Sequence, residues 1–277
     1  MKSKNFLFKK SRNLFYRIIN PLVKYFGFHL NSSVELLKIK SLIEKLYPVN
    51  SGINLIRIGP DSDGGYLIPE DLDGLTALFS PGVDIESRFE LELAKRGLKV
   101  FLADLSVENP SVIHPNFFFI KKFLGSFNSN YYLTLDSWIN NSEIDSSSDL
   151  ILQMDIEGYE YESIFSISDK NLNRFRIIVI EFHDLNRLIE PYFFCQFSRV
   201  IEKLLQNHSV VHIHPNNYFP TIQMGELEVP PIMEFTFLRN DRFYSREKRF
   251  DFPHILDKDN VMSKPSVVLP KSWYLSK

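Results

Sequence analysis

Apolar and polar positions predict an alternation of strands and helices from about residue 75 onward. Short apolar runs predict seven strands, at residues 75–80, 99–103, 117–124, 150–154, 177–181, 209–213 and 234–238. Residues 177–181 show no polar alternation, so we expect this strand to be buried on both faces. Residues 85–96 and 191–207 carry apolar side chains at helical spacing. The pattern is typical of an α/β fold, in which helices cover both faces of a mostly parallel sheet.

The segments on either side of this region suggest two appendages. A helix at residues 34–46 and two strands joined by an Asp-Gly-Gly turn within residues 54–69 are expected before the sheet. After residue 239 the chain becomes polar and is punctuated by prolines. We therefore expect a helical extension over residues 1–50, a main domain over residues 51–240, and a tail or lid over residues 241–277.

The first 30 residues are basic and amphipathic. They carry seven Lys or Arg and no Asp or Glu, whereas the rest of the chain carries 25 basic and 34 acidic side chains. Leu14, Ile18 and Leu22 recur near helical spacing, and Pro21 is expected to kink the helix. Residues 1–28 thus suit either a peripheral contact with an anionic membrane surface or packing on the protein itself or on a partner subunit. The acidic remainder argues against a nucleic-acid-binding groove.

Composition narrows the class of protein further. Of the 277 residues, 44% are hydrophobic, which is enough for a large core. The single cysteine, Cys195, excludes an internal disulfide and a metal site made of several thiolates. No apolar run approaches the roughly 18 residues of a membrane span. We therefore expect a cytoplasmic protein, at most peripheral to the inner face of the membrane.

Polar residues follow the predicted strands and form the candidate site. Ligands of open parallel sheets bind beyond the carboxyl ends of the strands, near the point where strand order reverses. The chain places acids, imidazoles, amides and a glycine turn at these ends: Ser80, Gly82, Asp104, Asp155, Glu157, Glu181, His183, His214, Asn216 and Asn217.

The first two strand ends suggest a nucleoside. Gly82 allows a ligand to approach the backbone next to a helix N-terminus, or it simply makes the turn. Asp104 can accept hydrogen bonds from both hydroxyls of a ribose, or it can cap a helix together with Ser106. Because the glycine turn and the acid occur together, we favour the ribose role.

The later strand ends suggest catalysis. Asp155 ends a nearly continuous apolar run, where a carboxylate needs a cation, a metal or a ligand. His183 titrates near neutral pH and is a candidate general base. With Glu181, these residues would also suit Mg²⁺ or Mn²⁺. Structural roles as an ion-pair partner or a loop histidine are the alternatives.

The segment 152–160 reads Leu-Gln-Met-Asp-Ile-Glu-Gly-Tyr-Glu, which resembles the Asp-(hydrophobic)-Glu-Gly-x-Glu signature of the FkbM family of S-adenosylmethionine-dependent methyltransferases. Segments 63–69, 80–83, 133–136, 181–183 and 212–217 are similar to a branch of that family. The resemblance extends over roughly residues 53–240, with the motifs in the right order.

This resemblance implies a class I methyltransferase (Rossmann-like) fold, a seven-stranded sheet with one antiparallel strand. By position, Gly82 would adjoin the amino-acid end of S-adenosylmethionine, Asp104 its ribose and Asp155 its sulfonium. Ser80 stands where the family usually has an acid. Tyr66, within residues 63–66, or Arg57 is therefore expected to complete that pocket.

The implied activity is methyl transfer to a hydroxyl of a sugar or sugar nucleotide, in surface-polysaccharide or secondary-metabolite biosynthesis. The expected catalytic residues are His183, Asp155 and Glu181, and the expected acceptor-binding residues are Glu157, His214, Asn216 and Asn217. Two other functions compete with this one. A NAD-dependent dehydrogenase of a small polyol or sugar also uses a glycine turn and a ribose-binding acid, and a non-catalytic module would dock membranes or partners through residues 1–28.

Overall fold

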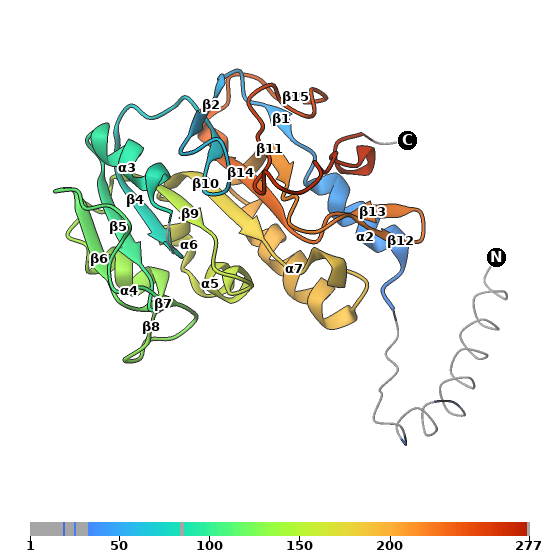
Figure 1. Ribbon diagram of the computed structural model, residues 1–277, viewed down its shortest axis with the longest axis horizontal. Helices are drawn as coiled ribbons and strands as arrows, with labels where there is room; N and C mark the ends of the chain where they lie inside the picture. Colours follow the sequence, from blue (N-terminus) through green and yellow to red (C-terminus); the bar gives the residue numbers. More distant parts are fainter. Residues whose placement is uncertain (1–18, 20–24, 26–32, 84–85, 276–277) are drawn as a thin grey trace.

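A seven-stranded sheet forms the centre of the molecule in the computed structural model, which describes residues 33–83 and 86–275 together with Ile19 and Tyr25 (Figure 1). Its strands are β4 (Leu75–Pro81), β5 (Lys99–Ala103), β6 (Phe117–Ile120), β9 (Asp149–Met154), β10 (Phe175–Phe182), β11 (His208–Pro215) and β14 (Met233–Arg239). The order across the sheet is β11-β14-β10-β9-β4-β5-β6. The seven expected strands are therefore confirmed, within a few residues at their ends.

The sheet is parallel except for β14, which pairs antiparallel with both β10 and β11. The chain starts in the middle of the sheet at β4, proceeds outward through β5 and β6, and returns to the other side of β4 as β9. Strand order thus reverses between β4 and β9, and the carboxyl ends of these two strands lie side by side. This is the expected class I methyltransferase arrangement.

Helices cover the sheet because alternate strand residues form a separate apolar cluster on each face. One cluster joins Phe79, Leu152 and Ile180 to buried side chains of α2 (Leu36–Lys45), α4 (Leu135–Asn140), α5 (Glu160–Ser166), α6 (Asp169–Leu172) and α7 (Pro191–Leu204). The other joins Leu78 and Ile151 to α3 (Arg88–Lys95) and to the hairpin of β2 (Leu55–Ile58) and β3 (Tyr66–Pro69). All eight residues of β10 are buried, which confirms its expected burial on both faces.

Several predicted boundaries were wrong. The single strand expected at residues 117–124 is two strands, because the chain turns at Lys122, whose N–H binds the Ile120 carbonyl. The second piece, β7 (Phe123–Leu124), pairs outside the main sheet with β8 (Tyr132–Leu133). The helix expected from residue 85 begins at Arg88, and the helix expected to reach residue 207 ends at Leu204. The amphipathic helix expected near the N-terminus lies, apart from Ile19 and Tyr25, outside the described residues.

The last 35 or so described residues pack onto the main body. The short strand β15 (Glu247–Lys248) pairs with β1 (Val49–Asn50), and Trp273, in the 3₁₀ turn η3 (Lys271–Trp273), is fully buried against Phe235. The remaining elements are the hairpin of β12 (Ile222–Met224) and β13 (Leu227–Val229) and the 3₁₀ turns η1 (Leu185–Arg187) and η2 (Asn240–Arg242). No helix within the described residues is long and apolar enough to cross a bilayer.

Candidate functional site

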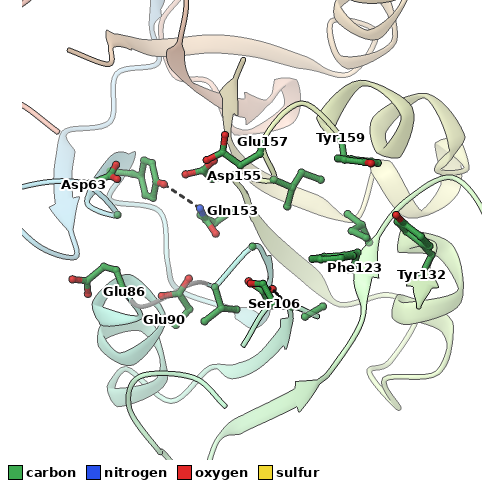
Figure 2. Close-up of a pocket in the computed structure, with 18 residues that line it drawn as sticks. Asp63, Glu86, Glu90, Ser106, Phe123, Tyr132, Gln153, Asp155, Glu157 and Tyr159 are labelled. Carbon is green, nitrogen blue, oxygen red and sulfur yellow. Dashed lines mark hydrogen bonds between the residues drawn. The ribbon is translucent and has the colours of Figure 1, made fainter. Parts of the chain in front are cut away.

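A cavity of about 490 Å³ opens at the carboxyl ends of β4, β5 and β9, where strand order reverses (Figure 2). Its size falls within the usual range for small-molecule sites. The lining residues are Asp63, Gly64, Tyr66, Gly82, Val83, Glu86, Glu90, Ala103, Asp104, Ser106, Phe123, Leu124, Tyr132, Gln153, Asp155, Ile156, Glu157 and Tyr159. Five of the residues named from the sequence are among them: Tyr66, Gly82, Asp104, Asp155 and Glu157.

The cavity has an acidic end and an aromatic end. Figure 2 shows Glu90 on α3, Glu86 just before α3, and Asp63 at one end, with the aromatic side chains at the opposite end. The aromatic residues are Phe123, Tyr132 and Tyr159. Six of the lining residues are Asp or Glu, and among the described lining residues none is Lys, Arg or His. The electrostatic potential in this cavity therefore favours cations and repels phosphates.

Gly82 allows the ends of β4 and β9 to approach each other. Its backbone has a φ of +82°, and a Cβ atom built on it would lie 1.8 Å from the main-chain oxygen of Asp155. Any other residue would collide with that backbone and would also be strained. Gly82 therefore shapes the floor of the cavity, whatever contact it makes with a ligand.

Asp104 stands at the end of β5 and reaches the cavity. Its Oδ1 accepts hydrogen bonds from the Ser106 N–H, at 2.7 Å, and from the Ser106 hydroxyl, at 2.6 Å. No described helix begins here, so these contacts form a turn rather than the helix cap considered from the sequence. The turn holds the carboxylate in place beside the cavity.

Ser80 lies behind the cavity wall and does not line it. Its hydroxyl lies 2.5 Å from Glu90 Oε1 and 2.6 Å from Gln153 Oε1, and Gln153 Nε2 donates in turn to the Tyr66 hydroxyl at 3.2 Å. Of the two candidates for completing this end, Tyr66 reaches the cavity. The guanidinium of Arg57 instead donates to main-chain carbonyls of the hairpin turn.

The Asp-x-Glu-Gly-x-Glu segment makes a sharp turn between β9 and α5. Glu157 and Gly158 both have positive φ, of 55° and 99°. Glu160, the first residue of α5, is fully buried and accepts hydrogen bonds from the Ile156 and Gly158 N–H groups at 3.0 and 3.2 Å. The last acid of the segment thus braces the turn that projects Asp155 and Glu157 into the cavity.

Glu160 also holds His183, which follows β10. Glu160 Oε1 lies 3.1 Å from His183 Nδ1, while His183 Nε2 lies 3.4 Å from Glu157, 3.7 Å from Asp155 and 4.0 Å from Glu181. His183 thus sits among four carboxyl groups, and one atom each from Asp155, Glu181 and His183 lies within 4.8 Å of the others. The expected catalytic group is therefore brought together, with Asp155 alone of the three lining the cavity.

Burial and neighbouring charges together shift the pKa values of His183, Asp155 and Glu181. Burial lowers the pKa of His183, but the hydrogen bond and charge of Glu160 and the charges of Asp155 and Glu157 outweigh it and raise the pKa to about 9. Burial raises the pKa of Asp155 to about 8, against the opposing charge of His183. Burial and the charge of Asp155 raise the pKa of Glu181 well above its usual value. This raised pKa favours an imidazolium near neutral pH, and the role of His183 as a general base stays a prediction.

The expected acceptor-binding residues after β11 contact protein groups and do not line the cavity. Asn216 donates to Glu181 Oε1 at 2.7 Å. Asn217 bonds the tail, donating to the Val261 carbonyl at 3.0 Å and accepting from the Val261 N–H at 2.8 Å. His214 is buried, with its Nδ1 3.7 Å from Asp257 of the same tail. The tail thus covers this edge of the sheet.

Sequence reasoning missed the lining residues that come from helices and loops. Glu90 and Glu86 looked like ordinary acids near a helix N-terminus, and Gln153 looked like part of a buried strand. The aromatic residues at 123, 132 and 159 carried no motif. Their spacing along the chain gives no signal, because the residues come from β7, from β8 and from the turn before α5.

Comparisons with solved structures give low overall similarity. A protein of Anabaena variabilis assigned as a methyltransferase of an antibiotic biosynthesis pathway is 16% identical with a TM-score of 0.25, over 51% of this chain and 58% of that one. Magnesium protoporphyrin IX methyltransferase of Synechocystis, solved with bound S-adenosylhomocysteine, is 12% identical with a TM-score of 0.31, over 61% and 76%. M. jannaschii TYW2, solved with S-adenosylmethionine, is 14% identical with a TM-score of 0.30, over 59% and 69%. No curated protein matches the sequence.

The strand order is that of the class I methyltransferase (Rossmann-like) fold, and the cavity lies where this order reverses. Residues 132–221 match the family model described as "Methyltransferase FkbM domain". The resemblance expected from the sequence motifs is therefore confirmed over this segment, which contains the Asp-(hydrophobic)-Glu-Gly-x-Glu motif. The match includes Asp155, Glu181 and His183 but begins after Gly82 and Asp104.

We predict that Gly82→Ala lowers the free energy of unfolding by more than about 3 kcal/mol, through backbone strain and the clash with Asp155. Gly97→Ala is the matched control, because Gly97 also has a positive φ, of 97°, but has open space around its Cβ position. It should cost only about 1–2 kcal/mol. Urea unfolding of both variants measures the difference, and equal losses would show that the close approach at Gly82 is unimportant.

Proposed function

We propose that S-adenosylmethionine binds along the cavity with its adenine at the aromatic end and its amino-acid part at the acidic end. The two ends of this cofactor are an aromatic base and an amino acid, which has a primary ammonium and a carboxylate; the base matches the aromatic end of the cavity, and the ammonium matches the acidic end. Asp104 also lines the cavity and would accept from the ribose hydroxyls. The observation that carries the proposal is this polarity, together with the six acidic lining residues.

The same observation disfavours a nicotinamide dinucleotide. Its pyrophosphate carries two negative charges and is usually bound by backbone N–H groups at a glycine-rich helix N-terminus. Here the Gly82 N–H is used by the Ala103 carbonyl at 3.0 Å. The acidic side chains of Glu86 and Glu90, just before and within α3, also line the ligand space.

S-adenosylhomocysteine is expected to raise the melting temperature of the full chain, and NAD is expected to leave it unchanged. Asp104→Asn should weaken S-adenosylhomocysteine binding about 10- to 100-fold, because a neutral amide replaces a charge-assisted acceptor. Asp136→Asn is the control, since Asp136 bonds the α6 N-terminus outside the cavity. Stabilisation by NAD instead of S-adenosylhomocysteine would reverse the proposal.

The acceptor that fits best is a neutral hydroxylated molecule such as a sugar. Glu157 is 86% exposed at the mouth of the cavity and offers oxygens to hydroxyl donors. Tyr159 is half exposed beside it and offers a ring face to the C–H side of a sugar. A sugar nucleotide would have to keep its diphosphate outside the acidic cavity. This orientation is compatible with the proposed role in surface-polysaccharide or secondary-metabolite biosynthesis.

Asp155 is the residue proposed to remove the acceptor proton. When bound, S-adenosylmethionine supplies a methyl group made electrophilic by a positively charged sulfur. Asp155 is the member of the catalytic group that lines the cavity. Its Oδ1 is buried without a hydrogen-bond partner among the described residues. The imidazolium of His183 orients this carboxylate, and Glu181 supports the imidazolium from the sheet side.

Asp155 is a base only after it loses its proton, so kcat/KM is expected to rise with pH up to about 8. A bound cation favours the charged carboxylate, so the rising limb of the pH profile should lie at lower pH for kcat than for kcat/KM. Asp155→Asn should lower kcat by roughly 100- to 10,000-fold and remove the limb.

Methyl-transfer rates between pH 6 and 9, measured with a radiolabelled methyl donor and a panel of sugars and sugar nucleotides, test this expectation. Glu157→Gln is the comparison variant: it should raise KM for the acceptor and keep the limb. If Asp155→Asn retained the rise of kcat/KM with pH and His183→Asn lost it, the imidazole of His183 would be the base instead of Asp155.

The group formed by Asp155, Glu181 and His183 has the donor atoms that Mg²⁺ or Mn²⁺ would need, and Glu181 Oε2 has no hydrogen-bond partner among the described residues. A protonated imidazole cannot be a ligand, since both of its nitrogens carry hydrogen. We propose that near neutral pH the proton on His183 occupies the place that a metal would take.

Mg²⁺ or Mn²⁺ is therefore expected to leave the melting temperature unchanged at neutral pH and to raise it only above about pH 9, where His183 becomes neutral. Glu181→Gln should remove that alkaline stabilisation. Loss of methyl transfer on adding a chelator at neutral pH would contradict the proposal and identify a resident metal.

A further inference from the structure

Glu90 projects from α3 into the acidic end of the cavity. It is 96% buried, since its exposed fraction is 4%, and it is the third residue of α3 (Figure 2). Ser80, the residue at the end of β4 that replaces the family's usual acid, lies 2.5 Å from the Glu90 carboxyl. The carboxyl group of Glu90 therefore lies next to the end of β4, where β4 itself supplies no acid.

The contacts of Ser80 match a neutral carboxyl group on Glu90. The hydroxyl of Ser80 has one proton but lies within hydrogen-bond distance of two acceptor oxygens, on Glu90 and Gln153. The amide of Gln153 is oriented by donating its N–H to Tyr66. With the amide in this orientation, one contact is donated by Glu90 itself, as a protonated carboxyl would do.

The surroundings of Glu90 agree with this protonation state. Burial raises the pKa of Glu90 to about 7, opposed by the Ser80 hydrogen bond, and the charge of Glu86 raises it further. On the strand side, Glu90 faces the uncharged Ser80, Gln153 and Tyr66. Across the cavity it faces the acids Asp63, Asp104, Asp155 and Glu157, and no cation lies among the described lining residues.

The same hydrogen-bond chain accepts an ionised Glu90 without losing a contact. If the amide of Gln153 reverses, its N–H donates to Ser80, the Ser80 hydroxyl donates to Glu90, and the Tyr66 hydroxyl donates to the amide oxygen. Both charge states are therefore fully hydrogen-bonded. A cation entering the acidic end would select the ionised state.

We propose that Glu90 is the ammonium-binding group of the cavity, replacing from α3 the acid absent at Ser80, and that it releases its proton when the ammonium enters. The proton leaves to solvent and the carboxylate pairs with the primary ammonium of the cofactor's amino-acid part. This proposal rests on the proposed seating of the cofactor in the cavity.

Isothermal titration calorimetry of the full chain with S-adenosylhomocysteine tests it directly. At about pH 6, in two buffers of different ionisation enthalpy, the wild type should release close to one proton per ligand bound. Its affinity should rise up to about tenfold per pH unit from pH 6 toward 7. Glu90→Gln should weaken binding roughly 10- to 100-fold at pH 7.5 and abolish the proton release. Its amide can still donate to Ser80, so the fold is expected to remain intact.

5′-Methylthioadenosine, which lacks the amino-acid part, provides the ligand control: the wild type and Glu90→Gln should bind it equally. Glu92→Gln provides the protein control, because Glu92 lies on the same helix outside the cavity and bonds the Gly59 N–H. Glu92→Gln should bind both ligands as the wild type does and keep the proton release.

Three results would overturn the role of Glu90 while leaving the cofactor site intact. They are unchanged S-adenosylhomocysteine binding by Glu90→Gln, equal weakening of both ligands, and affinity that falls as the pH rises from 6 to 7. The last would mean that a neutral Glu90 donates to the ligand carboxylate. If the wild-type chain bound neither ligand, the result would contradict both the proposed cofactor site and the proposed role of Glu90.

Discussion

The contact between Gly82 and the main chain of Asp155 is the constraint on which the site depends. The ends of β4 and β9 come so close that a single added Cβ atom would lie 1.8 Å from a carbonyl oxygen. This approach places the Gly82 turn, Asp155 and Glu90 of α3 around one cavity at the point where strand order reverses. A larger residue would separate the strand ends, and the two halves of the cavity would no longer face each other.

The second organising force is the concentration of acidic groups in a partly buried space. Burial and mutual repulsion raise the pKa values of Asp155, Glu181 and Glu90, and the same carboxyl groups raise the pKa of His183 despite its burial. Such a site is stabilised by a cation. The proposed cofactor carries two cationic groups, a sulfonium and a primary ammonium.

The tail is hydrogen-bonded to the main body of the protein, a structural role that its sequence did not predict. Asn217 bonds the tail backbone, Asn260 bridges Asp63 and Glu234, and Asp257 bonds His212 at 2.8 Å. Asn217, one of the residues expected to bind the acceptor, is thereby bonded within the protein, and Asn216 is bonded to Glu181. Glu157, which was also expected to bind the acceptor, lines the cavity.

The sequence by itself determined the seven strands and the acids at their ends, because hydrophobic periodicity and a local motif are properties of neighbouring residues. It also identified Gly82, Asp104 and Asp155 as candidate site residues, and all three line the cavity. Only the tertiary structure decided that Glu90 lies beside Ser80, that carboxyl groups around His183 raise its pKa, and that Asp257 of the tail lies beside His214. These facts depend on which side chains are desolvated together, and groups 10 to 48 residues apart acquire their contacts and proton affinities only when the sheet is assembled.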